Sequence, residues 1–340
     1  MSAMDRRPKG KARARWAILA KAIKRQADAA AGADAAGGGG ESDVSVMRFK
    51  SFGLLPATPL DPPPGDGGGG VWQAYRSAHH PECQVEIQVL PPTPSLDAMM
   101  GFNNTGNVCV WPSSEVLAHL CAAEPAAFAA KRVCELGAGM AGIAGLAVAV
   151  ASTAAEVVLT DGNRESAQNL AVCAARNRGR TAAETRVDTE VLVWDRGDPF
   201  PGHAGRFDVV LAADCLFFTE AHPDLVHTVA TLLAPGGVAL LVAPPRSGTL
   251  DRFAALAAAS PLLRCTRSEV ADPHVAAAIR AAAADPRSGF SDDLHRPVLL
   301  TLVREPPPAA AAAAEAGPVN ADAVSASPAE PAAAAAPGPG

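Results

Sequence analysis

Apolar runs alternate with amphipathic segments between residues 132 and 304. The short runs are rich in Val, Leu and Ala and have the length and β-branching of buried strands, and longer segments with helical spacing separate them. Strands are expected at 132–137, 156–161, 191–194, 207–214, 237–244 and 297–303. Helices are expected at 140–151, 165–177, 221–233, 249–258 and 274–284. This alternation predicts an α/β fold with a doubly wound, mostly parallel sheet that is covered by helices on both faces.

The pattern changes before and after this range. Three strand-like pieces, at 44–54, 71–76 and 84–90, are expected to pair in a smaller N-terminal region (44–102) on the substrate side of the main domain (103–304). Residues 27–43, 56–70 and 305–340 are rich in Ala, Gly and Pro and nearly lack large apolar side chains. Because such segments bury too little surface to offset the entropy of ordering, they are expected to be a linker, a disordered insert and a disordered tail.

Charge separates the first 26 residues from the rest of the chain. This segment holds nine Lys or Arg and one acid, whereas the remaining chain holds 20 basic and 34 acidic residues. On a helix one face would carry Trp16, Leu19, Ala20 and Ile23, and the opposite face would be basic. Three interpretations stay open: a helix that docks on an acidic protein with an apolar groove, an organelle transit peptide, and a solvated charge run.

Composition excludes several classes of protein. The seven cysteines form no C-x-x-C pair and no cluster with His, which argues against a zinc site and a disulfide framework and favours a reducing compartment. The longest apolar run, around 142–155, is too short to span a bilayer, and the N-terminus has no secretory signal. We therefore expect a cytoplasmic and possibly nuclear monomer without a metal, and without a nucleic acid or a membrane as partner.

A glycine-rich motif, ELGAGMAG, follows the first strand of the main domain. Gly137, Gly139 and Gly142 permit a tight turn and let a ligand approach the next helix, as in sites for NAD or S-adenosylmethionine, although a turn without ligand is also compatible. Asp161, at the end of the second strand, can accept both ribose hydroxyls of either ligand. Glu135 favours a ligand with a cationic sulfonium and an ammonium group over a pyrophosphate.

The ends of the next two strands supply further polar and aromatic groups. Trp194 is suited to an adenine ring, and a buried core position is the alternative. AADCLFF places Asp214, Phe217 and Phe218 at the same crevice, where a carboxylate and aromatic rings could orient a lysine amine; a helix-capping role is the alternative for Asp214. Cys215 has no partner typical of a nucleophile and is interpreted as a small buried residue.

Several motifs together resemble the seven-strand S-adenosylmethionine-dependent protein-lysine methyltransferases, and among them those that modify calmodulin. They are FNNTGNVCVWPSSEVLA (102–118), VCELGAGMAGIAGLAVA, VVLTDGN, LVWD, FDVVLAADCLFF, LLAPGG and PPRSGTL, with ARWAILAKAIKRQ, VSVMRFKSFGLL and LHRPVLLTLVR outside them. The resemblance implies a Rossmann-like seven-strand sheet, S-adenosylmethionine as cofactor and methylation of a calmodulin lysine up to the trimethyl form. An NAD-dependent oxidoreductase and a non-catalytic calmodulin-binding protein are the alternatives.

The resemblance also implies the roles of individual residues. The implied cofactor contacts are Trp111 closing over the cofactor, Gly137, Ala138 and Gly139 at its methionine end beside Glu135, Asp161 at its ribose, and Trp194 and the Ala213 backbone at its adenine. Asp214 and Phe217 match the catalytic D-x-x-Y/F element of the family, with Phe where many relatives have Tyr. The chain has one tyrosine, Tyr75, so a tyrosine-lined channel for the lysine is not expected.

Overall fold

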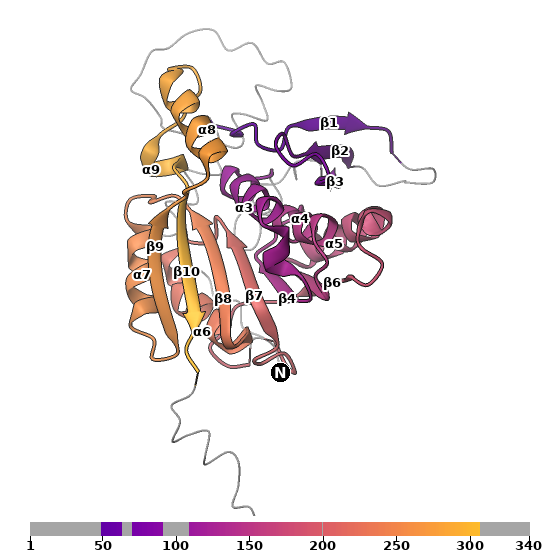
Figure 1. Ribbon diagram of the computed structural model, residues 1–340. Coiled ribbons are helices and arrows are strands. Elements are labelled where there is room, and N and C mark those ends of the chain that lie inside the picture. Colours follow the sequence, from indigo (N-terminus) through magenta and orange to yellow (C-terminus); the bar gives the residue numbers. More distant parts are fainter. Residues whose placement is uncertain (1–48, 63–69, 91–108, 199, 307–340) are drawn as a thin grey trace, which may run out of the picture. The chain divides into compact units, whose positions relative to one another are not determined.

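The computed structural model describes residues 49–62, 70–90, 109–198 and 200–306. The predicted basic helix (1–26) and linker (27–43) lie outside these residues, as does the tail beyond residue 306. The described residues form a seven-stranded sheet with helices on both faces, and a separate three-stranded sheet (Figure 1).

The large sheet has the strand order β6-β5-β4-β7-β8-β10-β9. Its strands are β4 (Arg132–Leu136), β5 (Glu156–Asp161), β6 (Arg186–Val191), β7 (Phe207–Ala213), β8 (Leu233–Ala243), β9 (Leu263–Glu269) and β10 (Val298–Arg304). The five strands from β6 to β8 are parallel, whereas β10 runs antiparallel to both of its neighbours. The chain order reverses beside β4, the position where open α/β sheets bind ligands. The prediction of a doubly wound, mostly parallel sheet is confirmed.

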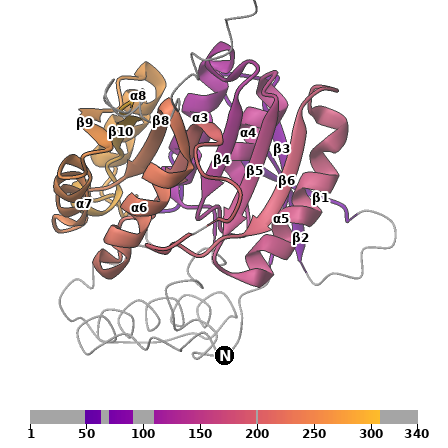
Figure 2. The same ribbon diagram turned by 90° about the horizontal axis from the view of Figure 1, so that it is seen from below.

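Two sets of helices cover the two faces of this sheet (Figures 1 and 2). One face packs against α3 (Pro112–Ala123), α4 (Ile143–Ala151) and α5 (Arg164–Asn177), and the other against α6 (His222–Leu232) and α7 (Thr249–Ala258). Alternate residues of β5 pack into the two hydrophobic cores. Val157 and Leu159 face the first core, on the α3–α5 side, and Val158 faces the second. The remaining helices are α8 (Pro273–Ala284) and the short α9 (Asp292–His295), and 3-10 turns lie at Pro125–Phe128, Arg178–Arg180 and Thr219–Ala221.

The small sheet consists of β1 (Ala57–Leu60), β2 (Val71–Arg76) and β3 (Gln84–Val89), all antiparallel. Its β3 strand packs against α4 and α5, because Val85 and Ile87 are fully buried and the Asn177 amide bonds both backbone groups of Glu86. The predictions for 71–76 and 84–90 are confirmed. The prediction of a disordered insert at 56–70 is wrong at 57–60, since an edge strand tolerates a proline such as Pro59.

Three other expectations differ from the structure. The predicted strand at 44–54 is a loop where it is described, because the Glu115 carboxylate binds its backbone amides. The third strand of the large sheet lies at 186–191 rather than 191–194, since an edge strand with half-exposed polar residues lacks an apolar run. Helix α3 and strand β9 were not predicted.

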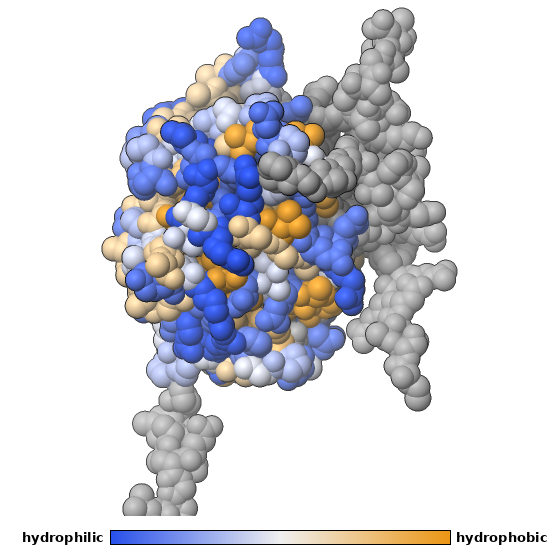
Figure 3. Space-filling model, turned by 90° about the vertical axis from the view of Figure 1, so that its right-hand side faces the viewer, coloured by the Kyte–Doolittle hydropathy of each residue, from blue (hydrophilic) through white to orange (hydrophobic). Residues whose placement is uncertain are grey.

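Few large apolar side chains are exposed among the described residues. On the side of the molecule shown in Figure 3, hydrophobic side chains form small groups among polar ones.

Within the described ranges, no helix is long and apolar enough to cross a membrane. The same residues contain no group of three or more His, Cys, Asp or Glu side chains arranged to hold a metal ion.

Candidate active site

The glycine-rich turn joins β4 to α4 at the carboxyl end of the parallel strands. Gly137, Gly139 and Gly142 have φ angles of 62°, 62° and 53°, in the left-handed region that other residues rarely adopt. A Cβ atom on Gly137 would lie 2.8 Å from the Cys215 sulfur and 3.1 Å from the Trp194 ring. The backbone conformation and the close packing both require glycine at this position.

Asp161 lies at the end of β5 and fixes the glycine turn. Its Oδ2 accepts a hydrogen bond from the Gly139 amide (2.9 Å), and its Oδ1 accepts one from the Asn163 amide (2.8 Å). Burial raises the pKa of Asp161 to about 6, although these amides favour the anion. Each carboxylate oxygen can accept more than one hydrogen bond, so Asp161 can still bind ligand hydroxyls.

Glu135 lies under the first turn of α4. Its Oε2 accepts a hydrogen bond from the Gly145 amide at 2.7 Å, where the positive end of the helix favours an anion. Only 3% of Glu135 is exposed, and burial raises its pKa to about 7. The structure thus gives Glu135 a contact with helix α4, and its predicted role toward a cationic ligand stays a prediction.

The remaining predicted cofactor residues lie at several element ends. Trp194, beyond β6, packs beside Gly137, and Ala213 is the last residue of β7. The Ala138 amide donates to the Thr160 carbonyl at the end of β5. Trp111 directly precedes α3. The structure brings the glycine turn, Asp161 and Trp194 together, while the predicted contacts of Trp111, Trp194 and Ala213 with a cofactor stay predictions.

Asp214 follows β7 in a strained backbone conformation. Its φ angle is 54°, and its amide donates to the Val242 carbonyl of the neighbouring strand at 2.9 Å. Its two carboxylate oxygens lie 3.0 and 3.1 Å from Nη2 of Arg246. The Arg246 guanidinium carbon also lies 5.8 Å from the centre of the Phe217 ring, within cation–π range. One arginine therefore contacts both residues of the D-x-x-F element.

A half-buried thiol, that of Cys109, lies near this ion pair. Burial raises the pKa of Cys109 to about 12, and the negative charge of Asp214 adds to this effect. The residues that precede α3 therefore lie close to the end of β7, although they are about a hundred residues apart in sequence. Burial likewise raises the pKa of Cys215 well above its usual value, which agrees with the interpretation of Cys215 as an inert buried residue.

Comparison with known proteins identifies the family. The profile of a family described as lysine methyltransferase matches residues 95–257. A calmodulin-lysine N-methyltransferase of Arabidopsis thaliana is 31% identical over 260 residues, which cover 70% of this chain and 79% of the relative. The chain belongs to the lysine methyltransferase family.

Two more similarities were found for this lysine methyltransferase. The protein N-lysine methyltransferase METTL21A of Danio rerio is 30% identical over 145 residues, which cover 42% of this chain and 63% of that relative. The solved structure of a geranyl diphosphate methyltransferase in complex with GPP and sinefungin covers 56% of this chain and 79% of its own, with 15% identity and a TM-score of 0.41.

Sequence reasoning missed one residue of the methyltransferase site, Arg246. The sequence indicates this residue only indirectly. A buried carboxylate such as Asp214, which is 8% exposed, requires a partner, and the PPRSGTL motif supplies an arginine directly after a strand. The alternative role of Asp214 as a helix cap is not what the structure shows, since its carboxylate binds this side chain.

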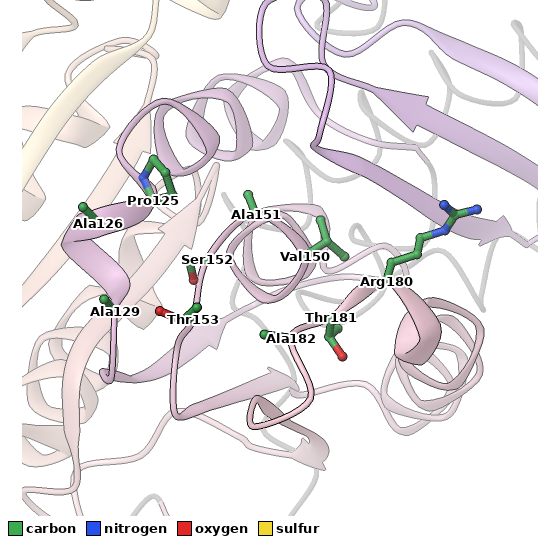
Figure 4. A pocket seen from close by; sticks show the side chains of 10 residues that line it. All are labelled: Pro125, Ala126, Ala129, Val150, Ala151, Ser152, Thr153, Arg180, Thr181 and Ala182. Carbon is green, nitrogen blue, oxygen red and sulfur yellow. The ribbon is translucent and has the colours of Figure 1, made fainter.

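A hollow elsewhere on the methyltransferase is separate from this site. It is lined by Pro125, Ala126, Ala129, Val150, Ala151, Ser152, Thr153, Arg180, Thr181 and Ala182 (Figure 4). Ser152 ends α4, whereas the glycine turn begins it, so the two lie at opposite ends of this helix. The lining consists mainly of small side chains, and Arg180 is paired with Glu86.

Proposed function

We propose that this lysine methyltransferase transfers methyl groups from S-adenosylmethionine to a lysine of calmodulin, up to the trimethyl form. The observation that carries the proposal is the 31% identity to a calmodulin-lysine N-methyltransferase over most of that relative's length. The same comparison favours this activity over an NAD-dependent oxidoreductase, which has only the glycine motif and Asp161 in its support.

The residues around the glycine turn fit the proposed cofactor. Gly137 and Gly139 have left-handed backbone conformations that permit the tight turn, and the Asp161 carboxylate retains acceptor capacity for two ribose hydroxyls. Trp194, beside Gly137, offers an aromatic face for adenine. When bound, S-adenosylmethionine supplies a sulfonium-activated methyl carbon, to which the lysine nitrogen donates its lone pair while the C–S bond electrons remain on sulfur.

The proposed catalytic role of this chain is to position a neutral amine and to exclude water. Asp214 is suited to orient the lysine nitrogen by a hydrogen bond, and Phe217 is suited to attract its cationic forms through the ring face. The amine carries a proton in neutral water and must lose it before it can act as a nucleophile. We therefore expect activity to rise with pH across the neutral-to-alkaline range.

The segment 1–26 is proposed as a docking helix for calmodulin. It lies outside the described residues, and its support is the positive charge and the apolar stripe in the sequence. Docking predicts that a chain starting at Glu41 loses kcat/KM for calmodulin while its affinity for S-adenosylmethionine is unchanged. Full activity of the shortened chain would leave the segment as a targeting signal or a solvated charge run, and the proposed cytoplasmic and nuclear location would then need a direct test.

Two assays test the proposal against its alternatives. Thermal unfolding with S-adenosylhomocysteine or NADH reports cofactor choice, because a ligand that binds the folded chain raises the unfolding temperature. We expect stabilisation by S-adenosylhomocysteine; stabilisation by NADH alone would contradict a methyltransferase. Transfer of labelled methyl to calmodulin then separates the enzyme from a non-catalytic binding protein, which would bind calmodulin without labelling it.

A further inference from the structure

The turn that follows β8 is strained at consecutive residues. Arg246, Ser247 and Gly248 have φ angles of 42°, 53° and 79°, and a conformation of this kind is costly for a residue with a side chain. Asp293, in α9, holds the turn: its carbonyl accepts from the Arg246 amide at 2.6 Å, and its carboxylate accepts from the amide and hydroxyl of Ser247. Hydrogen bonds with α9, which lies far from this turn in the sequence, therefore fix the backbone of Arg246.

The strained turn places the positive charge of Arg246 beside Asp214 and Phe217. The Arg246 side chain is 18% exposed and that of Asp214 is 7% exposed, so the pair is shielded from solvent. A single nitrogen, Nη2, lies close to both carboxylate oxygens, and the guanidinium lies over Phe217. A lysine that reaches Asp214 thus meets a neutral ion pair instead of an isolated anion.

We propose, on the basis of the function proposed above, that Arg246 is a positioning residue that fixes Asp214 and Phe217 beside the substrate lysine and, by its charge, favours the neutral amine of that lysine over the ammonium ion. The physical reason is that a nearby like charge disfavours the charged form of a group. An isolated Asp214 carboxylate would act in the opposite sense, because it would bind the ammonium ion tightly and hold its proton.

Several other titratable groups lie near the Asp214–Arg246 ion pair and have to be distinguished from the substrate lysine. Burial raises the pKa of Cys109 and of Tyr75 to about 12, and raises that of Cys215 well above its usual value. Asp161 and Glu135, which act on Cys215, have pKa values of about 6 and about 7. Within the part of the chain that the structure describes, the charged groups near the same residues include Asp293, which binds the turn, Lys50, which opposes the shift of Cys109, and Glu115, which adds to the shift of Tyr75. A midpoint above neutral pH that moves with the charge at position 246 is therefore attributed to the substrate lysine.

The test is the pH profile of kcat, measured at saturating calmodulin and S-adenosylmethionine, for Arg246→Gln, Arg246→Lys and the native chain, because kcat reports the groups that titrate in the enzyme–substrate complex. Loss of the charge in Arg246→Gln is expected to move the midpoint of the profile up by about one pH unit, which leaves about tenfold less neutral amine on the acid side of the midpoint. The loss should shrink as the pH rises above the midpoint. Arg246→Lys keeps the charge and is expected to keep the midpoint while kcat falls, because the planar guanidinium group that contacts both Asp214 and Phe217 is lost.

Binding provides a second readout that a purely structural role would not produce. The affinity of Arg246→Gln for calmodulin in the presence of S-adenosylhomocysteine, measured by calorimetry at neutral pH, is expected to be above that of the native chain, because the ammonium ion then meets an unpaired carboxylate. Asp214→Asn removes the opposite charge and should move the midpoint down. Arg267→Gln breaks the Arg267–Asp251 ion pair on α7 and β9 and serves as the matched control, with an unchanged profile.

Three results would overturn the inference in distinguishable ways. A uniform loss of kcat at every pH with an unchanged midpoint in Arg246→Gln would reduce Arg246 to a structural role. Shifts of Arg246→Gln and Asp214→Asn in the same direction would contradict the charge argument even if one variant folds poorly. A native chain that methylates no calmodulin at any pH would contradict the proposed function itself, and the inference with it.

Discussion

The Asp161 carboxylate is buried between two backbone amides and has no cationic partner among the contacts described for it. A buried anion of this kind is costly in the free protein, which is why burial raises its pKa to about 6. Hydroxyl groups of a bound ligand would donate further hydrogen bonds to the carboxylate and so stabilise its anionic form. Cofactor binding and proton release from Asp161 should therefore be coupled.

Asp161→Ala should weaken S-adenosylhomocysteine binding. The substitution removes charge-assisted hydrogen bonds of roughly 1.5–3 kcal/mol, which raises Kd about tenfold or more. Isothermal titration on a folded variant measures the effect. An unchanged Kd would remove Asp161 from the cofactor site.

The affinity for S-adenosylhomocysteine should also depend on pH through Asp161. Binding favours the anion, so the affinity is full above the free-protein pKa of about 6 and falls as the pH drops through that value. Asp161→Asn should bind more weakly at pH 8 and lose this dependence. Titrations between about pH 8 and 5 test this coupling, and an equally steep dependence in Asp161→Asn would assign it to another group.

At the scale of elements, Glu115 ties the segment before β1 to helix α3. Its carboxylate accepts hydrogen bonds from the Ser51 hydroxyl and from the amides of Phe52, Leu54 and Leu55, at 2.7–3.1 Å. One buried side chain thereby accepts hydrogen bonds from the backbone amides of a loop about sixty residues away in sequence. The loop also places Phe49 and Phe52 in contact with Phe290, near α9.

Glu115→Gln should destabilise the fold. The amide group replaces one acceptor oxygen with a donor, so at least one buried backbone amide loses its partner, at a cost of about 1–3 kcal/mol. The free energy of unfolding from denaturant titration measures the loss. Glu124→Gln, at the exposed end of the same helix, is the control and should change little. Equal stability of Glu115→Gln and the native chain would contradict the anchoring role.

The elements that could be predicted from sequence are those with a strong local pattern. Strands such as 156–161 and 207–213 have apolar runs at 157–159 and 209–213 that are buried on both faces, and helices such as 249–258 carry a clear apolar stripe. Strands 186–191 and 263–269 are half-exposed and rich in charged residues, so their pairing with a neighbour defines them and their composition does not. The glycine turn and Asp161 follow local rules, whereas the Asp214–Arg246 pair depends on tertiary contacts.

At the scale of the molecule, a group of histidines joins the small sheet, α3 and α8. His119 on α3 is fully buried and lies 3.1 Å from Asp272, which caps α8, and its ring lies 5.2 Å from that of His80. The ring of His79 stacks on that of His274 at 3.6 Å. Burial lowers the pKa of His119, although Asp272 opposes this shift.

The stability of the folded chain should therefore depend on the protonation of His119. Since its folded pKa is below the unfolded value of about 6.5, the unfolded state binds more protons below that pH, and the stabilisation present above it is lost as the pH falls. His119→Gln should have a lower unfolding temperature than the native chain at pH 8, and this difference should narrow toward pH 5. A constant difference across the range would show that His119 does not titrate with unfolding.

The central claim is that the D-x-x-F site of this lysine methyltransferase modifies one calmodulin lysine. Mass spectrometry of calmodulin after incubation with S-adenosylmethionine, for the native protein and its single Lys→Arg variants, tests this most directly. We predict added masses of one to three methyl groups that disappear in one Lys→Arg variant of calmodulin. We also predict a much slower reaction with the Asp214→Asn enzyme, whose affinity for S-adenosylhomocysteine is nearly unchanged. Unmodified calmodulin, with an enzyme that binds S-adenosylhomocysteine normally, would contradict it.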